Sequence, residues 1–274
     1  VKVFSANFRL YGDISNQVMA TLREFSPHVE QYSIDEMFLD FDGMKQDMND
    51  YGETIRRTIW QHTRMPVGVG IAPTKTLTKL ANHAAKNIKQ SNVAVLDTPA
   101  KWQWLQKRMP INKVWGIGKR LTTRLNAVGI HNAYQLAQAD ARFIRKQTSV
   151  NVERTIRELN GEPCIGLDEA PAPKKEIFVT RSFGTKTRSK EELLQHISRY
   201  AAAAAEKLRS QNSFCNSLYL FAHTSEFKPG FYNNSRVVRL PYPSSNSRLI
   251  IQHAKLGMSE IYRADGLFAK CGIG

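Results

Sequence analysis

The sequence is poor in cysteine and has no long apolar run. Its three cysteines, Cys164, Cys215 and Cys271, are far apart in a chain of 274 residues. An odd number of widely spaced cysteines predicts no disulfide framework, and with the seven scattered histidines they match no metal-ligand spacing. No apolar run approaches the roughly 20 residues of a membrane span. We therefore expect a cytoplasmic protein of a reducing compartment, with no membrane partner.

The chain also lacks an initiator methionine and the ordered charged and apolar regions of a signal peptide. It begins VKVFSANFRLYGD, in which polar and apolar residues are interspersed. We expect an internal fragment of a longer gene product.

Acidic residues are scarce compared with basic ones. The chain has 39 Lys and Arg against 24 Asp and Glu, a formal charge of +15. Residues 1–93 carry 11 basic and 10 acidic side chains, whereas residues 94–274 carry 28 and 14. A basic surface of this extent suggests nucleic acid or an anionic membrane as partner, the alternative being that the charge serves solubility alone.

The first block, residues 1–93, alternates strands and helices. Apolar residues at helical spacing, such as Val18, Leu22 and Phe25, predict helices, and short apolar runs predict strands. We expect strands at about 28–32, 36–41 and 67–72, and helices at about 13–26, 47–62 and 74–87. This alternation is typical of a mixed β-sheet with helices packed on it.

The rest of the chain has two further patterns. Residues 94–168 show helical spacing and, apart from a short strand at 93–96, no convincing strand, which predicts an all-α block. Two prolines and a charge run mark residues 169–175 as a linker. Residues 176–274 predict the order β-α-β-β-α-β, a split ferredoxin-like arrangement. The fold class is therefore α+β with several domains.

Two adjacent carboxylates, Asp35 and Glu36, interrupt the apolar stretch 31-QYSIDEMFLDF-41. Ionised carboxylates side by side repel each other unless a cation bridges them, and a bend between two strands lets them converge. Mg²⁺ typically takes one or two protein carboxylates, and two such ions about 4 Å apart can activate a hydroxyl and stabilise a leaving pyrophosphate. The candidate is a catalytic metal site; the alternative is a solvent-exposed hairpin tip.

A row of lysines is predicted on the helix that follows the strand 67-VGVGIA-72. Lys75, Lys79 and Lys86 lie within roughly 40° of one another on a helical wheel, opposite the apolar side chains. Ammonium groups in such a row can attract a triphosphate as point charges. The alternative is a solvated helix face.

The stretch 114-VWGIGKRLTTRLNAVGI-130 is typical of a helix-hairpin-helix. Gly116 and Gly118 permit a tight turn and leave backbone N–H groups free at a helix start, a ready anion site, and Lys119 follows at once. Such a motif grips the DNA backbone without reading sequence. In the last block, if Arg181 shares a strand face with Val179 and Phe183, then Ser182 points to the opposite face. A sheet face lined with Arg and Ser could track a duplex backbone.

In combination these motifs resemble Y-family translesion DNA polymerases. The order is SIDE at 33–36, VGVGIA at 67–72, K-T-L-x-K-L-A at 75–81, a lysine at 86, VWGIG at 114–118 and RSFG at 181–184. Details such as NHAAK and ERTIRELNGEPC are similar to the UmuC type. The resemblance covers nearly the whole chain, and DinB-type polymerase IV is the nearest alternative within the family.

The resemblance assigns roles to these residues. Asp35 and Glu36 match the metal-binding acidic pair, Lys86 the triphosphate-contacting lysine, and Arg181 with Ser182 a DNA contact. Gly116 and Gly118 match the thumb hairpin. Residues 1–93 then become a partial palm with the end of the fingers, 94–168 the thumb and 176–274 a C-terminally truncated little finger.

One departure is important. The family has a third metal-binding Asp in an opening strand, whereas the first acid here, Asp13, falls on a predicted helix. The resemblance therefore implies a fragment, inactive or nearly so alone, of a bacterial error-prone polymerase of the SOS response that takes dNTPs and primer–template DNA. Implied partners are a UmuD-type protein dimer, RecA and the sliding clamp. The alternative from another class is a DNA-binding relative that has lost catalysis.

Overall fold

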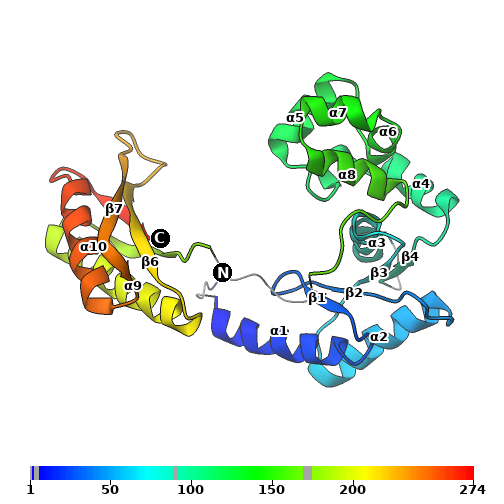
Figure 1. The fold of residues 1–274 in the computed structure, drawn as a ribbon, viewed down its shortest axis with the longest axis horizontal. Coiled ribbons are helices and arrows are strands. Elements are labelled where there is room, and N and C mark those ends of the chain that lie inside the picture. Colours follow the sequence, from blue (N-terminus) through cyan, green and yellow to red (C-terminus); the bar gives the residue numbers. More distant parts are fainter. Residues whose placement is uncertain (1, 3–5, 89–91, 169–174) are drawn as a thin grey trace. The chain divides into compact units, whose positions relative to one another are not determined.

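The computed structural model describes residues 2, 6–88, 92–168 and 175–274 (Figure 1). The chain forms two compact units, Val1–Pro171 and Ala172–Gly274, each with its own apolar core. Nearly all of the expected linker, residues 169–174, lies outside the described residues. Of the helices in the described residues, none is both long enough and apolar enough to cross a membrane.

The first unit opens with two helices and a hairpin. They are α1 (Phe8–Leu22), β1 (Val29–Gln31), β2 (Met37–Leu39) and α2 (Met48–Thr63). β1 and β2 pair antiparallel, with Glu30 opposite Phe38, and the two helices pack against each other (Figure 1). α1 begins at Phe8 rather than at Asp13, because the Asn7 side chain accepts a hydrogen bond from the Leu10 N–H at 3.1 Å and caps the helix there.

A parallel strand pair follows, joined by a crossover helix. β3 (Val69–Ile71) and β4 (Val93–Val95) pair side by side, and α3 (Lys75–Asn87) connects them, as a parallel pair requires. In the described residues, the strands of this unit thus form two separate pairs, one antiparallel and one parallel, and not the single mixed sheet that was expected. α3 packs closely on β3 because Gly70 has no side chain: a Cβ there would lie 2.6 Å from the Thr78 carbonyl oxygen.

The remainder of the first unit is helical, as predicted. Its helices are α4 (Pro99–Arg108), the 3₁₀ turn η1 (Ile111–Lys113), α5 (Lys119–Ala127), α6 (Ala133–Ala137), α7 (Ala141–Gln147) and α8 (Val150–Leu159). One apolar cluster runs from Leu77 and Leu80 of α3 through this block to Leu159. Both this core and β4 cross the expected boundary at 93/94.

The second unit has the predicted order β-α-β-β-α-β. Its elements are β5 (Val179–Thr187), α9 (Lys190–Ser210), β6 (Cys215–Thr224), β7 (Asn233–Ser244), α10 (Ser247–Ile261) and β8 (Phe268–Ile273). The sheet is antiparallel in the order β5-β8-β6-β7, so the last strand lies between β5 and β6 and splits the β5-α9-β6 unit. α9 and α10 pack together over the sheet (Figure 1).

We expect Gly70→Ala to lower the free energy of unfolding of the first unit by about 3 kcal/mol. The added methyl group would collide with the backbone of α3 at Thr78 and Asn82, which cannot move independently of the helix. Urea unfolding followed by circular dichroism checks this. Gly12→Ala, in open space on α1, is the matched control and should be neutral or slightly stabilising.

We expect Cys271 to resist alkylation in the folded protein. Burial raises the pKa of its thiol to about 12, so the thiol stays protonated at pH 9, and the thiolate is the reactive form. In urea it should react as fast as the other two cysteines. Iodoacetamide labelling followed by peptide mass spectrometry measures this, and rapid labelling of folded Cys271 would contradict the buried placement.

Candidate functional site

The acidic pair lies at the turn of the β1–β2 hairpin. The Tyr32 and Ser33 N–H groups both donate to the Glu36 carbonyl oxygen at 3.1 Å, which closes the turn. Asp35 is exposed at the tip, where its carboxylate accepts a hydrogen bond of 2.6 Å from the Ser33 hydroxyl. The Ile34 carbonyl oxygen accepts a hydrogen bond from the Ser15 hydroxyl, which ties the tip of the hairpin to α1.

Glu36 is directed toward α3. Its carboxylate is 2.7 Å from the ammonium nitrogen of Lys79, and both side chains are half-buried. The same ammonium lies 4.8 Å from the centre of the Tyr32 ring. One member of the acidic pair therefore meets the predicted lysine row, while Asp35 remains open to solvent.

Lys75 is not on an exposed row. Its side chain is 8% exposed and its ammonium pairs with the buried carboxylate of Glu30 on β1. It also donates to the Gly166 carbonyl oxygen at 2.6 Å and lies 5.0 Å from the centre of the Phe38 ring. Because the hairpin packs over the first turn of α3, this position is covered, which helical periodicity alone cannot reveal.

Lys86 is exposed in the last turn of α3, where its stem lies beside Gly68. It stands about three turns from Lys75 along the helix axis. The neighbouring His83 has its pKa lowered, chiefly by burial and further by the positive charges of Lys113 and Lys86. This end of α3 is thus a positively charged surface that favours an anion.

Aromatic side chains connect the acidic hairpin with the glycine loop. Trp115 lies between Val114 and Gly116, and its ring is 5.6 Å from Tyr32 and 5.9 Å from Phe38, centre to centre. Its indole N–H donates to the Tyr32 hydroxyl at 3.0 Å. The loop predicted to bind DNA phosphate is therefore in contact with the hairpin that carries the acids.

The glycine loop has the local geometry expected of it. Gly116 has φ +82°, which disfavours any residue with a side chain, and Gly118 is the N-cap of α5. No side chain caps this helix start, and Lys119 is its first residue, exposed to solvent. The N–H groups of the first turn remain available to an anion.

Arg181 and Ser182 lie on opposite faces of the second unit's sheet. Arg181 is opposite the buried Cys271, whereas Ser182 is opposite Lys270. Phe183, on the same face as Arg181, stacks on His196 of α9, so that face is the one the helices cover. A single sheet face therefore does not present both residues.

The acid pair fits the protein's share of a magnesium site only in part. Two carboxylates at an exposed bend suit an ion that completes its shell with water and phosphate oxygens. Glu36, however, already has Lys79 as its counter-ion. Across the described residues, no group of three or more His, Cys, Asp or Glu side chains is placed to hold a metal.

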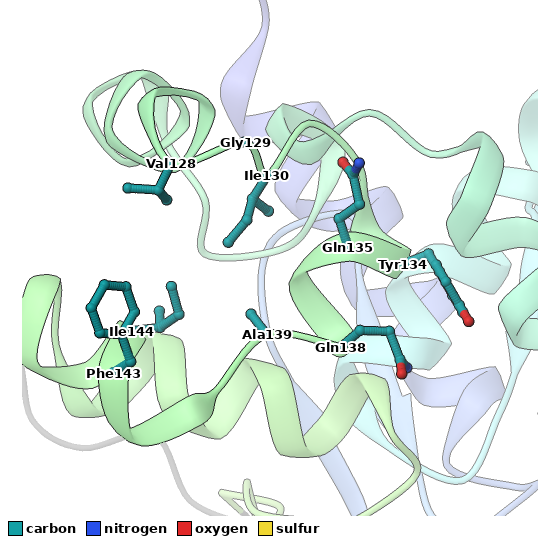
Figure 2. Close-up of a pocket in the computed structure, with 9 residues that line it drawn as sticks. All are labelled: Val128, Gly129, Ile130, Tyr134, Gln135, Gln138, Ala139, Phe143 and Ile144. Carbon is teal, nitrogen blue, oxygen red and sulfur yellow. The ribbon is translucent and has the colours of Figure 1, made fainter.

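A cavity of about 380 Å³ lies elsewhere in the first unit, between the end of α5, α6 and α7 (Figure 2). Val128, Ile130 and Phe143 form its apolar walls. The acidic pair, the lysines of α3 and the loop at 114–118 do not line it. The cavity is therefore separate from the candidate site.

A second buried carboxylate, Glu158 of α8, binds the first turn of α3, the helix that carries Lys79. One of its oxygens accepts from the Thr76 N–H and hydroxyl, both at 2.8 Å, and the other from the Cys164 and Ile165 N–H groups at 3.0 Å. Glu158 is fully buried. It caps the start of α3 and fixes the residues that follow α8.

Sequence reasoning missed Glu30, Glu158 and Trp115. Glu30 lies between Val29 and Gln31 in a predicted strand, and Glu158 precedes a core leucine, so both look like surface acids in the sequence. The one available signal was their position on the buried face of a predicted element, since an acid there needs partners. Trp115 could have been noted as an aromatic inside a glycine turn.

We expect Glu158→Gln to cost about 3 kcal/mol of stability, because two of the four N–H or hydroxyl donors would face an amide nitrogen instead of a carboxylate oxygen. Glu36→Gln should cost less than about 1 kcal/mol, since a half-exposed ion pair contributes little. Urea unfolding of the two variants makes the comparison. Equal losses of stability in the two variants would contradict the conclusion that Glu158 is structural whereas Glu36 belongs to the accessible site.

Two family models match the chain. The impB/mucB/samB family matches residues 1–83, and the C-terminal domain of the same family matches residues 174–274. The first match contains the hairpin and most of α3, and the second contains all of the second unit's elements. Together they span more than half of the chain.

Full-length relatives agree with these matches. Protein UmuC of Salmonella typhimurium strain LT2 is 43% identical over 279 residues, and protein MucB of Escherichia coli is 40% identical over 278. Both alignments cover 100% of this chain but 66% of the relative, so the chain spans just under two thirds of their length. DNA polymerase IV 1 of Bacillus subtilis is more distant, at 24% over 256 residues, covering 90% of this chain and 59% of the relative.

Solved structures show the same fold. A Y-family DNA polymerase chimera, Dbh-Dpo4(243-245)-Dbh, has a TM-score of 0.75 at 19% identity and covers 97% of this chain and 76% of its own. DinB from Sulfolobus solfataricus gives 0.50 at 20% identity, with the same coverage. The chain thus belongs to the impB/mucB/samB family, in the group of UmuC, ImpB, MucB and SamB, and has the fold of Y-family DNA polymerases.

Proposed function

We propose that the protein containing this chain is an error-prone DNA polymerase that copies damaged templates. The observation that carries this proposal is the meeting of Glu36 with Lys79, beside the exposed Asp35 and next to the loop of Trp115. A site for nucleotidyl transfer needs acids for metal, cations for phosphate and a nearby grip on DNA. The family membership supports the same activity.

In this proposal Asp35 and Glu36 hold magnesium, and Lys79 and Lys86 attract the incoming triphosphate. When bound, two magnesium ions would activate the primer's 3′ hydroxyl and stabilise the leaving pyrophosphate. Lys79 already shows that a cation is tolerated at Glu36. Lys75 is excluded from direct phosphate contact, because its ammonium is enclosed by Glu30 and Gly166.

We further propose that DNA is held by its backbone. Residues 94–168 would act as the thumb, with Gly116, Gly118 and Lys119 of a helix-hairpin-helix at a phosphate. Residues 176–274 would act as the little finger, with DNA contacts from Arg181 and Ser182 on opposite faces of the sheet. Binding of this kind should weaken as salt is added, since it depends on released counterions.

The cellular role in this proposal is DNA repair in the SOS response of a bacterium, in the cytoplasm. A UmuD-type protein dimer, RecA and the sliding clamp would be the partners. This part rests on the likeness to UmuC and MucB, both 40% or more identical to this chain.

A second candidate function is DNA binding without catalysis. It is favoured by the partial metal site: within the described residues, the acidic pair has no third ligand beside it. In this case the glycine loop and the basic second unit would still bind DNA. The full-length protein distinguishes the two, because only the enzyme extends a primer.

We expect Asp35→Asn and Glu36→Gln each to lower primer extension by the full-length protein about 100-fold or more, since each removes a metal-binding charge worth several kcal/mol. A gel assay of single-nucleotide insertion with Mg²⁺ measures the rate. Asp42→Asn, an exposed acid just after β2, is the matched control and should keep the rate. If both site variants extend like the unaltered protein, the pair is not catalytic.

A further inference from the structure

We propose that Lys75 is a positioning residue. It holds the β1–β2 hairpin, which carries Asp35 and Glu36, against α3, and it attaches residues 164–168, which lead toward the second unit, to the same helix. This role deepens the proposed function, and one of its two measurements, nucleotide binding, rests on that function. The geometry behind it is a buried ion pair, Glu30 with Lys75, at which three separate parts of the chain meet.

The three parts are β1, α3 and residues 164–168. Glu30 comes from β1 and Lys75 from the first turn of α3. The Glu30 carboxylate also accepts from the Asp168 N–H at 2.7 Å, and the Lys75 ammonium donates to the Gly166 carbonyl at 2.6 Å. Each charge of the pair is therefore satisfied by the other and by the backbone of the third part.

The neighbouring residue repeats this arrangement. Thr76 binds one oxygen of Glu158, whose other oxygen takes the N–H groups of Cys164 and Ile165. Successive residues of α3 thus use two buried carboxylates to hold one short segment. This double attachment of residues 164–168 to α3, the fastening, is therefore a specific feature of the fold rather than a chance contact.

This fastening bears directly on the candidate site. Glu36 lies on the same hairpin as Glu30, and Lys79 lies one helical turn after Lys75. Two ion pairs, one buried and one half-exposed, therefore join the same hairpin to the same helix. The buried pair fixes the position of the hairpin on α3, and the half-exposed pair is left to exchange its partners.

Burial excludes a direct phosphate contact by Lys75. To reach a triphosphate, the ammonium would leave Glu30 as an uncompensated charge in the interior, which is strongly unfavourable. Lys79 has no such constraint, because its partner Glu36 is itself accessible. The two lysines, four residues apart, therefore have different roles.

The test uses the full-length protein and four variants: Lys75→Met, Glu30→Gln, the double variant, and Lys79→Met as the matched control. Hydrogen exchange by mass spectrometry, without DNA or nucleotide, follows peptides covering 29–31 and 164–168. Binding of a fluorescent dATP analogue with Ca²⁺ and primer–template follows nucleotide affinity.

Lys75→Met should speed exchange in both peptides and weaken nucleotide binding about tenfold or more, through misplacement of the hairpin. The double variant should recover most of the slow exchange and most of the nucleotide affinity. Its Glu30→Gln side chain is uncharged, and the amide oxygen still accepts from the Asp168 N–H. Glu30→Gln alone should speed exchange, since Lys75 is then left without a counter-ion. Lys79→Met should weaken nucleotide binding without changing exchange at 164–168.

Two results would overturn the proposal. If the double variant regains slow exchange but binds nucleotide as weakly as Lys75→Met, then Lys75 contacts the nucleotide itself. If Lys75→Met changes exchange in neither peptide, the fastening does not exist. If the unaltered protein binds no nucleotide, the proposed function fails, while the exchange experiment still decides the positioning role.

Discussion

A carboxylate can be buried only where enough donors surround it, and this constraint organises the first unit. Glu30 and Glu158 are both buried, and both are satisfied by residues 75 and 76 together with the backbone at 164–168. Their donors come from segments far apart in sequence. The chain must therefore bring β1 to α3 and this short segment before Glu30 is compensated, and α8 to the same two parts before Glu158 is compensated.

The candidate site combines charged side chains with aromatic ones. Tyr32, Phe38 and Trp115 form a cluster of touching rings, and the ammonium groups of Lys75 and Lys79 lie over two of them. Ring faces attract cations, and apolar surroundings strengthen nearby charges. The half-exposed Glu36–Lys79 pair is thus stabilised by the Tyr32 ring and keeps access to solvent.

The fold could be predicted from sequence largely because periodicity reports local structure. α2 and α3 lie where apolar spacing placed them, with Asp47 and Thr74 as their N-caps, and the second unit has the predicted order of elements. What failed was long-range: whether the strands of the first unit share one sheet, and where β4 belongs. Those outcomes depend on pairing between distant segments, which a local pattern does not contain.

The candidate site divides in the same way. The Gly116 turn follows from local geometry, and the structure has it. The contact of Glu36 with Lys79, by contrast, joins segments far apart in sequence. The burial of Lys75 was not predictable from its helical face, because that depends on which segment covers the helix. Glu30 was missed for the same reason. Strand alternation did place Arg181 and Ser182 on opposite faces, but which face the helices cover needed the register with β8.

The uneven charge along the chain now has a structural meaning. In the first 93 residues acids and bases nearly balance, and the lysines of α3 that meet acids do so within the unit, at Glu30 and Glu36. Beyond residue 93 bases outnumber acids two to one, so a large part of that charge has no internal counterpart. Internal pairing suits residues that must be held in register, whereas unpaired surface charge suits contact with a polyanion whose sequence is not read. In the proposed function, the part with balanced charge positions the chemistry and the basic part holds nucleic acid.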